Sequence, residues 1–306
     1  MSRFTGTIAT AHGPLDLTGR ALVMAILNVT PDSFSDGGRY FSTDAAVERG
    51  LELAAEGADL LDVGGESTRP GSDPVAPDEQ CRRVLPVIER LRGKGLSIPV
   101  SIDTRSAHVA AAAFDRGADI VNDVSAMRDD AAMPALVAAR RVPSVLMHMQ
   151  GTPKSMQQAP EYVDVVADLL AFFRQRLVAA KSAGISADQI ILDPGVGFGK
   201  SAAHNWEILR RLPEFHELGR PLLVGPSRKR FVRAIVGDKP EDVLFGTAAT
   251  VAACCLAGAH IVRVHDVRAM RAIAAICEPI RRAAPSGNAP NTTTPTSKPA
   301  NTAPNG

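Results

Sequence analysis

The chain has 306 residues, of which 45% are hydrophobic and 22% are charged, as in an ordinary globular protein. Its 34 Lys and Arg residues nearly balance 33 Asp and Glu residues, so a net charge of +1 gives no general attraction to nucleic acid or anionic membrane. The single Trp and two Tyr argue against a stacking platform for single strands, and four cysteines without a Cys-x-x-Cys pair argue against a zinc site.

The first predicted element is a β-hairpin over residues 5–19, with its turn at Gly13-Pro14. Residues 21–29 then form the first of eight short apolar runs, each typical of a strand buried on both faces. Every run ends in polar or charged groups at its C-terminal side. In chain order, these ends begin at or contain Asn28, Glu66, Asp103, Asn122, His148, Asp193, Ser227 and Arg263.

A helical pattern follows each of the eight runs. The expected helices cover residues 43–56, 78–92, 106–116, 130–140, 160–183, 203–218, 240–257 and 267–282. Thr43, Asp78 and Ser106 are candidate N-caps, and Gly57, Gly93 and Gly117 are candidate helix ends. Alternating strands and helices indicate parallel pairing, and eight repeats predict a closed (β/α)8 TIM barrel. An open doubly wound sheet is the alternative, but it usually has fewer strands.

Two segments of the chain differ sharply in composition. Residues 1–284 are predicted to form one barrel domain, and residues 285–306 a disordered tail of Pro, Thr, Asn, Ser and Ala with few large apolar side chains. The N-terminus shows no signal-peptide pattern, and no apolar stretch is long enough to cross a bilayer. We therefore expect a cytoplasmic protein.

The stretch from Ile190 to Lys200 contains the first candidate site. A buried strand runs into Asp193, Pro194 and three glycines, and a carboxylate in that place is costly unless it binds something. Spacing excludes two phosphate motifs, because a Walker loop needs glycine where Pro194 stands and a dinucleotide fingerprint needs glycine where Lys200 stands. Asp193 is therefore the informative residue.

In a TIM barrel the strand ends meet at one mouth, where Asp103, Asn122 and Asp193 could read the edge of a flat heterocycle, with Met147 against its face. The alternative is that these are buried polar groups whose hydrogen bonds are satisfied by the backbone.

Cations near strands seven and eight predict an anion site. They are Arg228, Lys229, Arg263 and His265, beside Ser227, with structural ion pairs to acids such as Asp266 as the alternative. The loops 30–38 and 64–71 have the composition of active-site lids.

Taken in order, several of these motifs resemble the bacterial dihydropteroate synthase family of pterin-binding barrels. The resemblance covers residues 15–282, and the motifs that carry it are residues 28–38, 64–71, 103–105, 122–123, 191–200, 227–229 and 263–266. It implies an enzyme of folate biosynthesis that joins 6-hydroxymethyl-7,8-dihydropterin pyrophosphate to p-aminobenzoate, releases pyrophosphate, uses Mg²⁺ and is a sulfonamide target. It also implies a homodimer, for which we expect residues 243–257 to form the interface.

Roles for individual residues follow from the same resemblance. The implied pterin contacts are Asp103, Asn122, Met147, Asp193 and Lys229. The implied pyrophosphate contacts are Asn28, Arg263 and His265, with Asn28 also at the metal. The implied p-aminobenzoate contacts are Phe34, Thr68, Arg69, Pro70, Phe198 and Ser227. We expect Asp103, Asp193, Lys229, Arg263 and His265 to be the catalytic residues, and Asp62 and Glu66 to be structural.

The sequence departs from the family at Pro226 and Gln150, and neither departure removes a matched contact. A pterin-binding methyltransferase and a catalytically silent paralogue are the competing functions. A methyltransferase would not need two lids and a cationic rim to bind a pyrophosphate and an arylamine. A silent paralogue would have lost a lid or a rim cation. No Ser-His-Asp or Cys-His pattern suggests a covalent intermediate, so the chemistry is expected to rely on positioning and charge, with a dissociative reaction.

Overall fold

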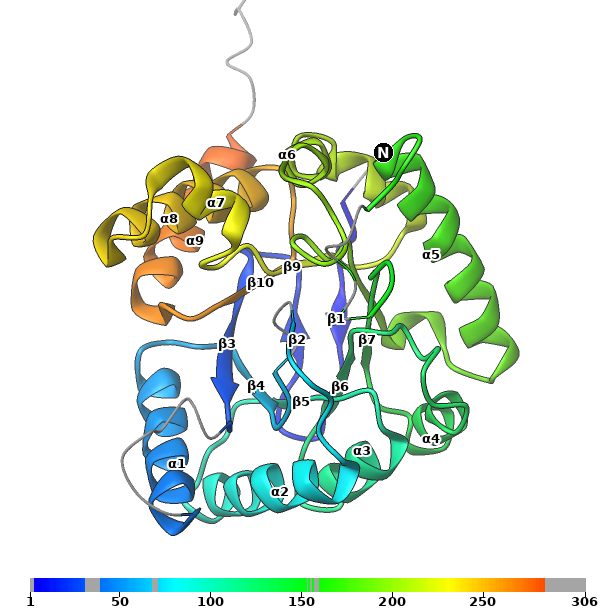
Figure 1. Ribbon diagram of the computed structural model, residues 1–306, viewed down its shortest axis with the longest axis vertical. Helices are drawn as coiled ribbons and strands as arrows, with labels where there is room; N and C mark the ends of the chain where they lie inside the picture. Colours follow the sequence, from blue (N-terminus) through cyan, green and yellow to red (C-terminus); the bar gives the residue numbers. More distant parts are fainter. Residues whose placement is uncertain are drawn as a thin grey trace, which may run out of the picture.

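A computed structural model of the chain describes residues 3–30, 39–67, 71–152, 154, 156 and 160–283, with only the backbone of 39–42. Its centre is a ring of parallel strands enclosed by helices (Figure 1). The strands lie in the order β8-β7-β6-β5-β4-β3-β10-β9. Their bounds are β3 Leu22–Asn28, β4 Leu60–Gly64, β5 Val100–Asp103, β6 Ile120–Asp123, β7 Ser144–Met147, β8 Ile190–Asp193, β9 Leu223–Val224 and β10 Ile261–Val264.

The two ends of this sheet also meet. Leu192 of β8 forms a parallel bridge with Leu222, just before β9, and its N–H donates to the carbonyl of Pro221 at 2.9 Å. The sheet is therefore closed into a barrel, as the eight repeats predicted, and the open-sheet alternative is excluded.

The predicted hairpin is present as β1 (Thr7–Ile8) and β2 (Leu15–Asp16), paired antiparallel. Its apolar residues Ile8, Leu15 and Leu17 are buried against the residues that begin the barrel strands, among them Leu22 and Ile120. The hairpin thus covers the N-terminal end of the barrel, which leaves the C-terminal end for the site.

The outer layer is made of α1 Arg39–Ala55, α2 Pro77–Gly93, α3 Ala107–Phe114, α4 Met133–Arg140, α5 Val165–Ser182, α6 Ala202–Arg210, α7 Arg230–Val236, α8 Pro240–Leu256 and α9 Val267–Arg282, with the 3₁₀ helices η2 Ala187–Gln189 and η3 Leu212–Leu218. Two differences from expectation have physical reasons. The helix expected over 203–218 divides at Arg211, because Pro213 has no N–H to continue the α-helical ladder. Helix α7 was missed because it has only seven residues.

The predicted helix ends are partly correct. Ser106 caps α3 through its side chain, as predicted. Thr43 lies inside α1, and Asp78 follows Pro77 in the first turn of α2, so those two predicted caps are wrong. Gly57 and Gly117 end their helices with φ of 98° and 95°, whereas α2 extends through Gly93.

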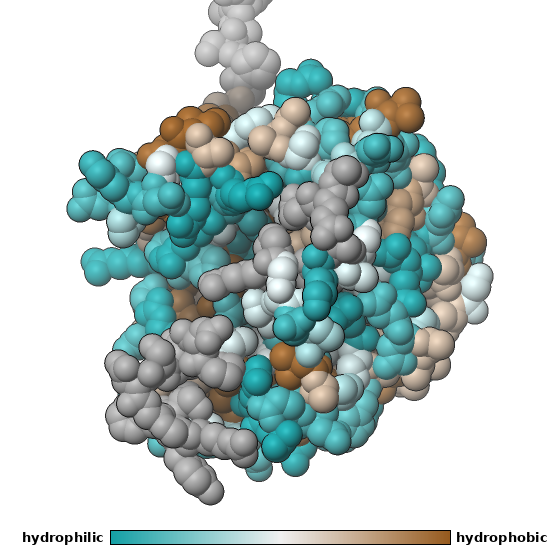
Figure 2. Space-filling model, in the orientation of Figure 1, coloured by the Kyte–Doolittle hydropathy of each residue, from teal (hydrophilic) through white to brown (hydrophobic). Residues whose placement is uncertain are grey.

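The core between barrel and helices is apolar and includes the free cysteines Cys254, Cys255 and Cys277. None of the helices in the described part of the chain is long and apolar enough to cross a membrane. On the face shown in Figure 2, the described surface is mostly hydrophilic, with hydrophobic side chains in small separate patches.

Candidate active site

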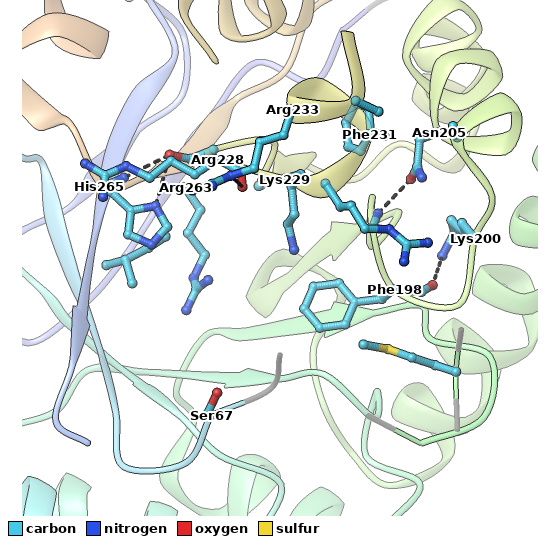
Figure 3. A pocket seen from close by; sticks show the side chains of 18 of the residues that line it. Ser67, Phe198, Lys200, Asn205, Arg228, Lys229, Phe231, Arg233, Arg263 and His265 are labelled. Carbon is cyan, nitrogen blue, oxygen red and sulfur yellow. Dashed lines mark hydrogen bonds between the residues drawn. The ribbon is translucent and has the colours of Figure 1, made fainter. Parts of the chain in front are cut away.

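A cavity of about 750 Å³ lies at the C-terminal end of the barrel (Figure 3). Residues that follow four different strands line it: Asn28 at the end of β3, Phe198 after β8, Lys229 after β9, and Arg263 and His265 on and after β10. A second, much smaller hollow shares Phe198, Lys229 and Arg263 with it. The mouth therefore offers two adjoining compartments.

The small hollow is lined by residues that were predicted to bind a heterocycle. They are Asp103, Asn122, Met147, Asp193 and Lys229. Strand register explains why they meet: Asp103 pairs with Asn122 across β5 and β6, and Met147 pairs with Asp193 across β7 and β8. Residues paired across parallel strands stand at one level of the barrel, so their side chains reach the same layer. Because all four stand at strand ends, that layer is the mouth.

Arg263 is the centre of a buried charge network. Its Nε donates to Asp62 Oδ2 at 2.5 Å, and its Nη2 donates to Asp103 Oδ2 at 2.8 Å. Asn122 donates its amide N–H to the same oxygen of Asp62, at 3.1 Å. Asp62, which is expected from the sequence to be structural, orients two predicted substrate contacts through these hydrogen bonds. The signal for it was a charged residue inside a strand predicted to be buried.

The two acids of the small hollow have raised pKa values. Burial, followed by the neighbouring charge of Asp62, raises the pKa of Asp103 to about 7, against the opposing effect of Arg263. Burial raises the pKa of Asp193 to about 6, while a hydrogen bond from the Gly195 N–H and the charge of Lys229 oppose it. Burial also lowers the pKa of Lys229 to about 8. Groups with such values are typical of functional sites.

The larger cavity holds the predicted anion contacts. The backbone N–H of His265 donates to Ser227 Oγ at 3.2 Å, and that Oγ lies 3.0 Å from His265 Nδ1. Burial, with Arg228 and Arg263 nearby, lowers the pKa of His265 to about 3, so its imidazole is neutral. If Ser227 donates to Nδ1, the imidazole carries its proton on Nε2, where it can donate to an anion.

Arg228 also lines this cavity, but its guanidinium forms a bidentate ion pair with Asp266, at 2.5 and 3.1 Å, so the structural interpretation of the rim cations holds for this residue. Arg230 and Arg233 of α7 line the same cavity. They were missed because α7 was missed.

Phe198 lies between the two compartments. The Nζ of Lys229 stands 4.0 Å from the centre of its ring, an arrangement visible in Figure 3. Gly197 permits this approach, because a Cβ there would lie 2.9 Å from Lys229 Cδ. The other predicted p-aminobenzoate contacts, Phe34, Thr68, Arg69 and Pro70, lie outside the described residues.

The same site has known counterparts. Residues 24–265 match the sequence profile of pterin-binding enzymes. The dihydropteroate synthase of Synechocystis is 44% identical over 264 residues, which cover 86% of this chain and 91% of that protein. The solved structure of Xanthomonas albilineans dihydropteroate synthase with 4-aminobenzoic acid superposes with a TM-score of 0.85 at 45% identity, covering 92% of this chain and all of that one. A Yersinia pestis dihydropteroate synthase in a sulfonamide drug complex gives a TM-score of 0.85 at 40% identity, covering 91% and 100%.

The barrel, the polar strand ends and the matched profile define a pterin-binding enzyme. The identities and coverages above go further: the chain belongs to the dihydropteroate synthase family.

Proposed function

We propose that this enzyme joins 6-hydroxymethyl-7,8-dihydropterin pyrophosphate to p-aminobenzoate, giving 7,8-dihydropteroate and pyrophosphate in folate biosynthesis. The observation that carries the proposal is the pair of adjoining compartments that share Arg263. One offers acids and an amide to a heterocycle, and the other offers cations to an anion. A substrate that is a pterin at one end and a pyrophosphate at the other fits both.

Within this proposal, the pterin lies in the small hollow. Asp193 accepts from the amine edge of the ring, Asp103 and Asn122 bind the same ring system, Lys229 donates to it, and Met147 packs on its face. The pyrophosphate lies in the larger cavity against Asn28, Arg263 and His265. Phe198 and Ser227 would hold the arylamine together with Phe34, Thr68, Arg69 and Pro70 of the two loops.

A magnesium ion fits this arrangement. The described residues contain no group of three or more His, Cys, Asp or Glu side chains placed to hold a metal. Mg²⁺ is commonly bound by one or two protein oxygens together with substrate phosphates and water, so the carboxamide oxygen of Asn28 suffices as the protein ligand. When bound, the ion would neutralise charge on the departing pyrophosphate.

The direct test of the proposal is a turnover assay with the pterin pyrophosphate, p-aminobenzoate and Mg²⁺. Dihydropteroate and pyrophosphate should form in equal amounts, and a sulfonamide should raise the apparent KM for p-aminobenzoate without changing that for the pterin. An enzyme that binds the pterin without turnover would be a silent paralogue, and the proposal would be wrong.

We also propose that the reaction is dissociative. Breaking the C–O bond leaves a cation that the dihydropterin ring can share, and Asp193 would favour this by accepting hydrogen bonds from the ring. Arg263 and the neutral His265 would hold the departing charge at the other end. Interactions that strengthen where charge develops lower the barrier. The amine then attacks without needing a base.

Isotope scrambling tests this mechanism. With Mg²⁺ present and p-aminobenzoate absent, ¹⁸O placed in the bridging position of the bound pterin pyrophosphate should move to non-bridging positions without net product. Retention of the label, with a rate that rises steeply with the basicity of substituted anilines, would instead indicate direct displacement.

We further propose a homodimer through α8, in the cytoplasm, where the free cysteines stay reduced. Val251 and Cys254 of this helix face its own barrel, but Phe245 is 70% exposed. Ile235 on α7 is exposed to the same extent. Helices α7 and α8 pack against each other, so these side chains would contribute to one apolar patch, and contiguous patches of this kind mark contact surfaces.

Phe245→Asp should therefore yield monomers in sedimentation at micromolar concentration, whereas the wild-type chain sediments as a dimer. Val178→Asp on α5, a similarly exposed apolar site at 66%, is the matched control and should leave the dimer intact. A monomeric wild-type chain would contradict the proposal.

A further inference from the structure

Lys200 is a lysine buried at 2% exposure in the loop that follows β8 (Figure 3). Its ammonium lies among four acceptors: 2.9 Å from the carbonyl oxygen of Phe198, 3.0 Å from that of Gly195, and 3.0 and 3.3 Å from Nδ1 and the carbonyl oxygen of His148. An ammonium has three hydrogens to donate, and such charge-assisted bonds are stronger than neutral ones. The reaction described above gives this cluster no role.

The cluster joins two neighbouring strand ends. His148 follows β7, whereas Gly195 and Phe198 belong to the loop after β8. The loop after β8 also packs closely on the segment after β7: a Cβ at Gly195 would lie 2.0 Å from the His148 carbonyl oxygen, and one at Gly199 would lie 2.6 Å from that of Gln150. The loop is therefore held in two ways, by this close packing and by the hydrogen bonds of the Lys200 ammonium.

Three backbone N–H groups of this loop are used within the protein. Gly195 donates to Asp193 Oδ1 at 2.7 Å, Gly197 to Asn205 Oδ1 at 2.7 Å, and Phe198 to the Gly195 carbonyl at 3.0 Å. This agrees with the expectation from spacing that the loop is not a nucleotide cradle. The loop instead presents the side chain of Phe198, which lines both compartments.

Burying an ammonium group costs free energy, so filling space does not by itself explain a lysine at position 200. Burial lowers its pKa to about 7, while the negative charge of Asp193 favours the protonated form. Burial and then Lys200 itself lower the pKa of His148, so its imidazole is neutral and Nδ1 can accept. A methionine would fill the same volume without this cost, so the hydrogen bonds are the feature that requires lysine.

We propose that Lys200 is a positioning residue for the reaction: it fixes the ring of Phe198 beneath Lys229, at the boundary between the pterin hollow and the larger cavity, where this ring would contact the arylamine. The inference rests on the proposed function for its kinetic consequence. The bond to the Phe198 carbonyl acts on the backbone atom adjacent to the Cα that carries the ring. Displacement of this ring would remove its contact with the arylamine in the larger cavity, whereas Asp103, Asn122 and Lys229 would remain to bind the pterin.

Lys200→Met is the test variant, because it keeps the volume and removes the donors. The matched control is Tyr162→Phe, which removes the 2.8 Å hydrogen bond from the Tyr162 hydroxyl to the Gly199 carbonyl of the same loop but keeps the ring that contacts His148 and removes none of the four contacts of the ammonium. Lys200→Met should raise the KM for p-aminobenzoate by roughly tenfold or more, as misplacement of a positioning group does, and leave the KM for the pterin within about threefold. Tyr162→Phe should change both values less than about twofold.

Phe198→Leu completes a double-mutant cycle. If Lys200 acts through Phe198, adding Lys200→Met to Phe198→Leu should raise the arylamine KM no further. Additive effects, or a fall in kcat and melting temperature with both KM values unchanged, would show a merely structural role and overturn the inference. Lys200→Gln replaces Lys200→Met in the same cycle if the latter fails to fold.

A readout without turnover separates this inference from the proposed function. In protein labelled with fluorophenylalanine, the ¹⁹F resonance of Phe198 is identified by its loss in Phe198→Leu. It should shift or broaden in Lys200→Met and stay unchanged in Tyr162→Phe. An unchanged resonance in Lys200→Met would overturn the inference, whereas a wild-type enzyme without turnover would overturn only the proposed function.

Discussion

Arg263→Ala should abolish most of the activity and also destabilise the fold. The side chain is 17% exposed and pairs with Asp62 and Asp103. Its removal leaves two buried carboxylates without their cation, and breaking a buried pair in this way costs about 3–5 kcal/mol of unfolding free energy. Loss of a charge-assisted contact to the pyrophosphate costs about 1.5–3 kcal/mol more in binding, so kcat/KM should fall roughly 10–10²-fold from that contact alone.

From the sequence, we expected Arg263 to act at the pyrophosphate end only. Its ion pairs with Asp62 and Asp103 add a loss of fold stability to the expected effect of the substitution. The matched control is Arg228→Ala, which breaks the ion pair with Asp266 at a guanidinium whose side chain is 46% exposed. Such an exposed pair is worth about 0–1 kcal/mol. Denaturant unfolding and steady-state kinetics on both variants make the comparison. Intact pyrophosphate affinity in Arg263→Ala would remove this residue from the anion site.

Asp193→Asn should lower kcat/KM roughly 10²-fold, because a neutral amide accepts hydrogen bonds from the pterin more weakly than a carboxylate. Its oxygen can still accept from the Gly195 N–H, so the loop after β8 should keep its structure. The loss should appear in the affinity for the pterin and in kcat, and not in the affinity for p-aminobenzoate. Asp16→Asn, an exposed change of the same charge in the hairpin at the far end of the barrel, is the control.

The raised pKa of Asp193 gives this prediction a pH dependence. Since the folded pKa is about 6 and the usual value is 3.8, the folded protein holds more protons than the unfolded chain between these values. The contribution of this carboxyl to the free energy of unfolding therefore falls as the pH rises from 3.8 to 6. Wild-type affinity for the pterin should weaken as the pH falls through 6, in addition to any effect of Asp103 near pH 7, and Asp193→Asn should lose the part of this dependence that is centred on pH 6. A variant whose pterin affinity equals that of the wild type would refute the role of the carboxylate.

The periodicity of the sequence predicted the barrel, but only the bridge between Leu192 and Leu222 excluded an open sheet. In a barrel the C-terminal ends of the strands meet at one mouth, and the residues near those ends, such as Asp103, Asn122 and Asp193, were predicted as site residues for that reason. Helix boundaries were less well determined, because caps such as Thr43 and breaks such as Pro213 depend on local geometry.

Only the tertiary structure decided how the charges pair. The sequence shows that Asp103 and Arg263 are ionisable and near strand ends and that Asp62 lies inside a strand. Arg263 is 201 and 160 positions from Asp62 and Asp103, respectively, so its ion pairs with them depend on the curvature and register of the closed sheet. The same holds for Lys200 and His148, which are 52 residues apart in sequence and 3.0 Å apart in the barrel. Chemical character is local and can be read from one residue, whereas the partner that sets its pKa and orientation is a property of the fold.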